Sequence, residues 1–336
     1  MERLKRKVEK KFGIAVKQWK VIKDEKKSSI VVRVVTKEGK EYALKSLYIP
    51  TERQLFISQS EQMLAERGVD LARPVPAQNG DLYMLYKKYP YVLNEWVNGK
   101  SAKLGSQSDL IKLVKTMAHF HHASQNLEYP SNISTYEHPH WVKEYKDRVK
   151  SIEKWMNRNK ESQNRNKAII NRHIAYFLRM AKKALKLLKT SRYDDYIAGR
   201  AASASLVHGD YHHNNVILDH NKLYMIDFED VRYDLPSKDL LRIYSMYTKN
   251  HAFDSGQFRN MLRAYEKVNA LAPEVRQLVL IDLMFPHIFE RLLRKKKYVG
   301  MSPDELKHRI KQEKKKAAYV YKHYFKRSQA NGRASD

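Results

Sequence analysis

The sequence predicts an α+β protein of two lobes, a small β-rich N-terminal lobe and a large helical C-terminal lobe. The chain has 336 residues, which is more than one compact core usually holds. Short apolar strand-like runs are concentrated in the first hundred residues, and helical periodicity dominates from Ser106 onward. We therefore expect the β-rich lobe at 1–96, the helical lobe at 97–327 and a disordered polar tail at 328–336.

In the first lobe, the basic and weakly amphipathic residues 1–27 predict a helix that leads into a sheet. A second helix is predicted over 51–67, because its apolar positions follow helical spacing and Gly68 follows as a stop signal. The predicted strands cover residues 30–35, 41–47, 81–86 and 92–97.

In the second lobe, apolar residues at i, i+3 and i+4 predict a helix that begins near Ser106. A loop is expected over 126–139, where prolines and small polar residues interrupt the periodicity. Further helical segments are predicted over 141–155, 167–189 and 255–324.

Composition limits the class of protein. Hydrophobic residues make up 42% of the chain and charged residues 30%, which is typical of a folded protein with a highly charged surface. The absence of cysteine excludes disulfides and thiolate metal sites. No apolar run approaches the ~20 residues of a membrane helix, and the N-terminus lacks the apolar core of a secretory signal. We expect an intracellular protein without membrane association.

The net charge of +28 comes from 65 Lys and Arg against 37 Asp and Glu. Such a field attracts polyanions, although solvated helix faces also explain many of these residues. No zinc finger, RNA-binding motif or basic zipper is present, so we expect no specific nucleic-acid partner.

A β-hairpin is predicted within residues 206–230. Two apolar runs, 216–218 and 223–226, flank the turn residues 219–222. Since the strands of a hairpin are antiparallel, Asn215 before the first strand should lie beside Asp227 after the second.

Asp210 lies five residues upstream of Asn215, in a loop introduced by His208 and Gly209. Two carboxylates and an amide at one end of a hairpin offer the oxygen ligands that Mg²⁺ prefers. The alternative is that these residues form only a polar turn and an acidic hairpin end.

The pattern His208-Gly209-Asp210-x-x-x-x-Asn215, followed by Ile226-Asp227-Phe228-Glu229, resembles the catalytic and metal loops of kinase-fold phosphotransferases. The glycine of the first motif and the Phe-Glu pair of the second are similar to the aminoglycoside phosphotransferase and choline kinase branch. This resemblance implies a bilobal protein-kinase-like fold and an ATP- and Mg²⁺-dependent phosphotransferase that acts on a hydroxyl group. It implies the following roles: Asp210 as catalytic base, Asn215 and Asp227 as Mg²⁺ ligands, and His208 and Asp239 as structural support.

Two N-terminal segments fit the same resemblance. Ala43-Leu44-Lys45 resembles the strand-borne lysine that contacts nucleotide phosphates, although a lysine on a strand is more often a solvated edge residue. Residues 94–99 resemble the hinge that meets adenine, which implies nucleotide contacts at Glu95 and Val97, with Gly99 allowing the chain to turn.

The chain also departs from the kinase pattern. No glycine lies between Gly13 and Gly39, so the loop that should cover the phosphates has no glycine-rich form. The helix at 51–67 offers several candidate partners for Lys45, and the sequence leaves the choice open. The candidates are Glu52, Glu61 and Glu66, with Ser58 or Gln59 as alternative occupants of the relevant face.

The segment YVLNEWVNGKS at 91–101, with Leu55-Phe56-Ile57, resembles the CotS-type spore-coat-associated branch of this superfamily. That resemblance implies a location in the mother-cell cytoplasm or the spore coat, with other coat proteins as partners. Two hypotheses stay open. The chain is either a phosphotransferase for an unknown small-molecule or protein acceptor, or a kinase-fold coat component with weak or absent activity. A basic nucleic-acid-binding protein is a third reading, and no motif supports it.

Overall fold

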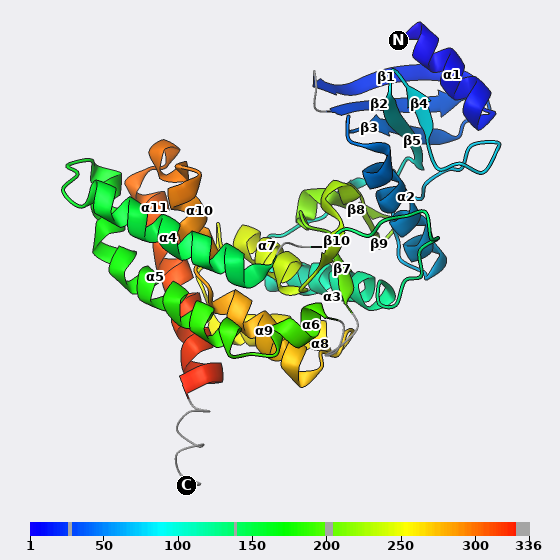
Figure 1. Ribbon diagram of the computed structural model, residues 1–336. Helices are drawn as coiled ribbons and strands as arrows, with labels where there is room; N and C mark the ends of the chain where they lie inside the picture. Colours follow the sequence, from blue (N-terminus) through cyan, green and yellow to red (C-terminus); the bar gives the residue numbers. More distant parts are fainter. Residues whose placement is uncertain (26–28, 138–139, 199–203, 327–336) are drawn as a thin grey trace. The chain divides into compact units, whose positions relative to one another are not determined.

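The computed structural model describes residues 1–25, 29–137, 140–198 and 204–326 (Figure 1). The predicted tail at 328–336 lies outside these residues. The chain forms two compact units, and both are discontinuous in sequence. The first comprises residues 1–103, 119–137 and 206–233, and the second comprises residues 104–118, 138–205 and 234–336. The predicted hairpin therefore belongs to the same compact unit as the N-terminal sheet. The boundary between the two lobes that we expected at residue 96 stays a prediction.

A five-stranded antiparallel sheet forms the first part of the first unit, in the order β1-β2-β3-β5-β4. The predicted strands are confirmed, with their ends shifted by a few residues. The bounds are β1 (Val16–Glu25), β2 (Ser29–Thr36), β3 (Glu41–Ser46), β4 (Met84–Tyr86) and β5 (Tyr89–Glu95).

The helix predicted over residues 1–27 is only half right. Helix α1 (Glu2–Phe12) ends at Gly13, which adopts a left-handed conformation with φ 67°. The following segment, Val16–Glu25, is strand β1 and pairs with β2. Most β1 side chains are exposed, so the strand lacks the alternation of apolar and polar residues that would reveal it.

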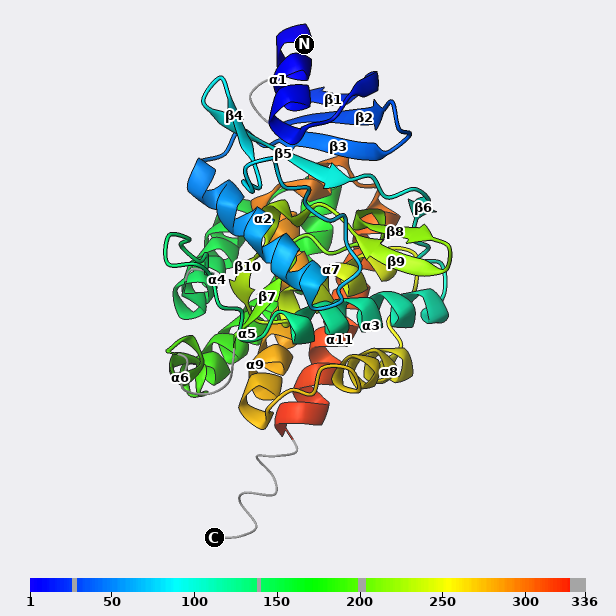
Figure 2. The ribbon, with the colours of Figure 1, turned by 90° about the vertical axis from the view of Figure 1, so that its right-hand side faces the viewer.

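The core of this sheet lies beneath α1, which runs along the sheet in both views (Figures 1 and 2). Leu4, Val8 and Phe12 of α1 pack with buried residues of the strands, including Val32 and Leu44. Burial of this apolar face, rather than the strongly basic composition of α1, holds the helix in place.

Helix α2 (Thr51–Glu66) follows β3, as predicted, and the predicted hairpin is also present in the first unit. Strand β8 (Val216–Asp219) pairs with β9 (Lys222–Met225), and the short β6 (Lys100–Ser101) adds to the other edge of β8. His220 and Asn221 in the turn have φ 41° and 67°, the sign that a two-residue hairpin turn of type I′ requires. Short strands β7 (Ser205–Val207) and β10 (Arg232–Asp234) flank the hairpin in sequence and pair with each other.

The second unit is helical, as predicted. Helices α4 and α5 contact each other along a long helical hairpin, and α5 also packs against α9 and α11. Helix α3 begins in this unit and ends in the first. The bounds are α3 (Gln107–Ala123), α4 (Trp141–Asn159), α5 (Arg165–Lys189), α6 (Tyr193–Ile197), α7 (Ser237–Tyr247), α8 (Ser255–Glu266), α9 (Pro273–Met284), α10 (His287–Arg294) and α11 (Pro303–Val320). None of the described helices combines the length and apolar character that a membrane crossing needs.

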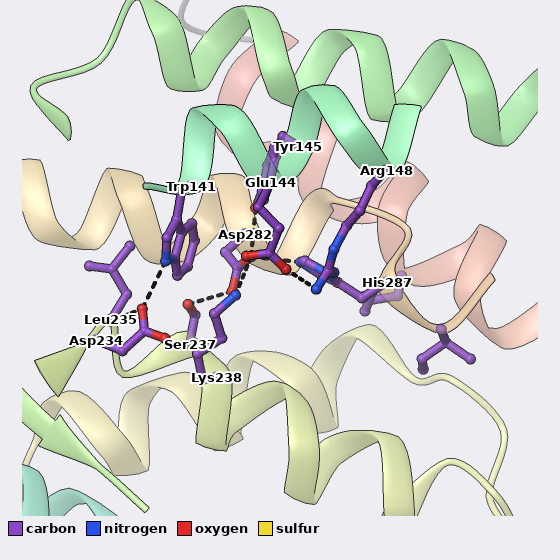
Figure 3. A network of polar contacts seen from close by, with 12 residues as sticks. Trp141, Glu144, Tyr145, Arg148, Asp234, Leu235, Ser237, Lys238, Asp282 and His287 are labelled. Atoms are coloured by element: carbon purple, nitrogen blue, oxygen red, sulfur yellow. Dashed lines mark hydrogen bonds and ion pairs between the residues drawn. The ribbon is translucent and has the colours of Figure 1, made fainter. Parts of the chain in front are cut away.

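A fully buried carboxylate in α9 gathers polar groups from three other helices (Figure 3). Asp282 Oδ1 accepts hydrogen bonds from Tyr145 Oη of α4 and His287 Nε2 of α10, both at 2.6 Å. Asp282 Oδ2 accepts a third from Ser237 Oγ of α7, also at 2.6 Å. One acid thus ties together α4, α7, α9 and α10.

The positive charge of Lys238 balances the negative charge of Asp282 in this network. Lys238 Nζ lies 3.9 Å from Asp282 Oδ1 and 3.8 Å from the centroid of the Trp141 ring, a cation–π arrangement. Burial alone would raise the pKa of Asp282, but Lys238 and His287 outweigh burial and hold the pKa of this carboxyl well below its ordinary value.

His287 takes part as a neutral ring. Burial lowers its pKa to about 4, so the ring carries one proton at neutral pH. Since Nε2 donates to Asp282, Nδ1 is left as an acceptor, and Arg148 of α4 donates to it. Figure 3 shows Arg148 between this ring and Glu144, with which it forms an ion pair.

Candidate functional site

The centre of the candidate site is an ion-pair triad in the first unit. Lys45 of β3 forms an ion pair with Asp227, 182 residues further along the chain. Its ammonium also lies 2.5 Å from Glu229 Oε1. The lysine is therefore not a solvated edge residue, because its side chain is only 22% exposed and holds two carboxylates of the segment after the hairpin.

The triad sets the charge state of its members. Burial alone would lower the pKa of Lys45, but Asp227 and Glu229 outweigh it and raise the pKa above its ordinary value. Burial opposes ionisation of Asp227 as well, but Lys45 lowers the pKa of this carboxyl. Burial raises the pKa of Glu229, and the nearby charge of Asp227 adds to this effect. Asp227 is therefore the acid that stays ionised more readily.

Asp227 is held in an unusual backbone conformation. Its φ of 73° lies in the left-handed region, which Asp and Asn tolerate better than most residues. Phe228 anchors the segment because its ring packs against His208 and Phe120 in the core. Arg53 of α2 donates to the backbone oxygen of Glu229 at 2.7 Å. The surrounding contacts thus fix a conformation that is costly by itself.

The hairpin brings the predicted metal residues together, as we expected. The Ile226 N–H donates to the Asn215 backbone oxygen at 3.0 Å, so Asn215 lies opposite the residue that precedes Asp227. Asn215 Nδ2 donates to the Asp210 backbone oxygen at 3.1 Å, which ties the loop to the hairpin. One amide N–H is used in this way, and the amide oxygen of Asn215 is the group suited to a metal.

The loop around Asp210 is shaped by its two preceding residues. His208 is fully buried, and its Nε2 lies 2.9 Å from the Ile226 backbone oxygen. Gly209 has φ 84°, and a Cβ there would lie 2.5 Å from the Asp230 backbone oxygen, so only glycine fits. The Asp210 carboxylate is 42% exposed and lies 3.4 Å from His212 Nε2.

A cavity of about 560 Å³ lies beside the triad within the first unit. The predicted nucleotide contacts Glu95 and Val97 line it, as do Lys45 and Asp227. Gly99 also lines it with φ 132°, and a side chain there would collide with the Leu218 backbone oxygen, which explains the glycine. All three predicted nucleotide-binding residues therefore border one space.

Among the open candidates of α2, Glu61 is the one that the structure brings to this cavity. It is buried, and Asn94 Nδ2 donates to its Oε2 at 3.3 Å. Burial raises its pKa to about 7, an effect that the hydrogen bond from Asn94 and the charge of Lys45 only partly offset. Lys45 forms its ion pairs with Asp227 and Glu229 rather than with Glu61.

Replacing Glu61 with glutamine should remove a pH-dependent cost to stability. Because the pKa in the folded state lies above the ordinary 4.5, the folded protein binds more protons between pH 4.5 and about 7, and stability falls as pH rises through this window. Glu61→Gln should therefore gain stability relative to wild type, by up to about 3 kcal/mol above pH 7. Urea unfolding from pH 4.5 to 8 measures this. The exposed Glu66→Gln is the matched control, and equal curves for both variants would refute the effect.

Asp239, the predicted brace of the catalytic loop, belongs to the second unit. It is fully buried in the first turn of α7, directly after Ser237 and Lys238 of the Asp282 network. Its supporting role stays a prediction.

The sequence alone does not single out three residues of the site. Glu229 is there only part of the family pattern, Arg53 belongs to no motif, and Glu61 is one of several open candidates. A signal for Glu61 did exist, since Gln54, Ser58 and Glu61 have helical spacing and form a buried polar stripe on α2. Such a stripe indicates a helix face directed at a polar site.

The donor chemistry fits a magnesium ion. Within the described ranges, no three histidine or acidic side chains form a group that could hold a metal by themselves. The predicted ligands are one carboxylate and one amide oxygen, Asp227 and Asn215, and Mg²⁺ is commonly bound by few protein ligands together with phosphate oxygens and water.

Comparison with known proteins agrees with this geometry. Residues 21–278 match the model of the phosphotransferase enzyme family (APH). Spore coat protein S of Bacillus subtilis (strain 168) is 24% identical over 271 residues, which cover 80% of this chain and 77% of that protein.

Solved structures show the same fold. An aminoglycoside phosphotransferase from Alicyclobacillus acidocaldarius subsp. acidocaldarius DSM 446 superposes with a TM-score of 0.75 at 18% identity, covering 93% of both chains. The amicoumacin kinase hAmiN, in complex with AMP-PNP, Ca²⁺ and Ami, gives a TM-score of 0.60 at 16% identity, covering 94% of this chain and 93% of that one. The predicted kinase-like fold, an antiparallel sheet followed by a helical region, is confirmed. The chain is a member of the phosphotransferase enzyme family and a distant relative of a spore coat protein.

Proposed function

We propose that this protein is an ATP- and Mg²⁺-dependent phosphotransferase that transfers a phosphoryl group to a hydroxyl of an acceptor not yet known. The observation that carries the proposal is the contact of Lys45 with Asp227 beside the cavity that Glu95 and Val97 line. Lys45 and Asp227 are 182 residues apart in the sequence, and packing of apolar side chains does not by itself require their charged groups to come into contact.

Each residue has a role that its surroundings support. The Lys45 ammonium stabilises negative charge on the nucleotide phosphates, and its raised pKa keeps it protonated. The backbone of residues 95–97 meets the adenine edge. Asp227 and Asn215 hold the metal, which when bound neutralises phosphate charge. Asp210 orients the acceptor hydroxyl and accepts its proton, and its partly exposed carboxylate is accessible for this.

Ligand-dependent stabilisation tests the proposal directly. We expect the melting temperature of the protein to rise with ATP when Mg²⁺ is present and to change little with either one alone, because a ligand that binds the folded state stabilises it. A control with Mg²⁺ and adenosine separates phosphate recognition from adenine binding. If ATP with Mg²⁺ gives no rise at millimolar concentrations, the proposed site is refuted.

The similarity to spore coat protein S favours a second candidate function, a kinase-fold component of the spore coat in which activity is weak or absent. The lack of glycine between Gly13 and Gly39, where phosphates would be covered, also supports it. This candidate would place the protein in the mother-cell cytoplasm or in the coat, with other coat proteins as partners. Absence of a metal-dependent shift with ATP would favour it over the first.

A further inference from the structure

The positive charge of the chain is concentrated in the second unit. This unit holds 41 Lys and Arg against 18 Asp and Glu, a net +23 of the total +28. The ion-pair triad and the cavity of the proposed phosphotransferase site lie in the first unit. A field of this strength on one unit favours association with a negatively charged partner.

Helix α5 has the largest excess of positive charge among the described helices of the second unit. Its 25 residues include eight Lys and Arg and no Asp or Glu. Its apolar side is buried against neighbouring helices, for example through Phe177, whose ring stacks on Phe289 at 4.0 Å. The opposite side is exposed, and α5 and α4 lie next to each other in Figure 1.

Four exposed cations form a regular line on α5, which we call the α5 basic row: Arg165, Arg172, Arg179 and Lys186. They recur at every seventh position, so they share one face and follow each other at about 10.5 Å along the axis. Within the described part of the chain, none of the four forms a hydrogen bond or an ion pair with another side chain. Placed in line on an exposed face, these four charges add to the positive field of the second unit.

A second column lies three residues further along the same face. It begins with Ala168 and Ala175 and continues with Lys182 and Lys189. The alanines leave space beside the first half of the row. Lysines of this face can pair with a carboxylate of a neighbouring helix. The Lys182 ammonium forms an ion pair with Glu153 of α4 at 2.6 Å.

From this arrangement we infer that the exposed face of α5 binds an acidic α-helix of a partner protein. A helix that carries glutamate or aspartate at one heptad position repeats its charges at the same spacing as the α5 basic row. The alanine positions let the backbone of such a helix approach closely, and matched charge pairs fix its register.

The surface suits a protein helix better than a lipid bilayer or a nucleic acid. Among the described residues of the second unit, the large hydrophobic side chains that are exposed are Ile197 and Val299, and neither lies on α5 to enter a bilayer. The two aromatic side chains Phe177 and Tyr176 of α5 offer no open stacking platform for bases, since Phe177 is buried and Tyr176 is half-buried beneath Lys314.

A synthetic helical peptide with glutamate at every seventh position, of the length of α5, is the probe. We expect it to bind the full-length protein at low ionic strength and to weaken steeply with added salt. Reversing the α5 basic row (Arg165, Arg172, Arg179 and Lys186 to Glu) should weaken binding by roughly tenfold or more. The matched control reverses four exposed cations of the first unit, Arg3, Lys10, Lys17 and Lys20, and should keep most of the affinity.

Register is tested by a second peptide of the same composition with its glutamates shuffled out of the heptad. Clearly weaker binding of this peptide supports the inference, and equal binding of both peptides overturns it. Tighter binding to a single-stranded oligonucleotide or to anionic vesicles, lost in the same variant, also overturns it. If the fourfold variant does not fold, Arg172→Gln with Arg179→Gln gives the same test through a smaller loss. Unchanged peptide binding in that variant counts against the inference.

Discussion

Replacing Asp227 with asparagine is expected to lower the affinity for Mg²⁺ and ATP at least about 100-fold, which corresponds to roughly 2.7 kcal/mol. The substitution removes the negative charge that would face the metal and that holds Lys45 in place. Asparagine has the same shape and tolerates the left-handed φ of 73°, so the backbone around the site should stay as it is. Titration calorimetry with ATP at fixed Mg²⁺ measures the effect.

The matched control is Asp219→Asn, which removes the same charge at the other end of the hairpin. Asp219 lies at the turn, where its carboxylate is 3.7 Å from His220 Nε2 on the surface. Binding should be unchanged in this variant. If Asp227→Asn and Asp219→Asn both bind the nucleotide as wild type does, Asp227 is not a metal ligand and the proposed site falls.

The second large effect concerns stability. Asp282→Asn should lower the free energy of unfolding by about 3–5 kcal/mol, because it leaves the Lys238 ammonium, whose side chain is only 13% exposed, without its counter-charge and the donors of the network with a weaker acceptor. Urea denaturation at pH 7 measures the loss.

Asp254→Ala provides the comparison within the same unit. Asp254 caps α8 by accepting a hydrogen bond from the Gln257 N–H at 2.7 Å near the surface, and losing such a cap costs about 1 kcal/mol. A loss for Asp282→Asn no greater than that of the cap would contradict the view that this carboxylate organises four helices.

The parts of the fold that sequence alone could predict are those with strong local signals. The hairpin is one, because two apolar runs and turn residues that tolerate positive φ occur within eleven positions. Strand β1 could not be predicted, because it pairs along one edge of the sheet and exposes most of its charged side chains. Its strand character comes from pairing with β2, a tertiary effect that local periodicity does not contain.

In the candidate site, too, features with a local sequence signal could be predicted, and contacts between distant segments could not. Asn215 beside Asp227 follows from the geometry of a hairpin and could be predicted. The attachment of Lys45 to Glu229 depends on a contact between distant segments, and no spacing rule reveals it. Asp282 gave a hint, since one acid interrupts an otherwise apolar run from 278 to 285, which indicates a buried charge with partners. Only the structure identifies those partners, because they lie on other helices.

The triad of Lys45, Asp227 and Glu229 has one further consequence. One ammonium facing two carboxylates leaves this corner of the cavity with an excess of negative charge. In the proposed phosphotransferase, a bare nucleotide with several negative charges of its own would be repelled there, whereas a nucleotide already complexed with a divalent cation would not. On the proposed function, the ion pairs of the unliganded protein would therefore favour the metal-bound form of the nucleotide before any chemistry begins.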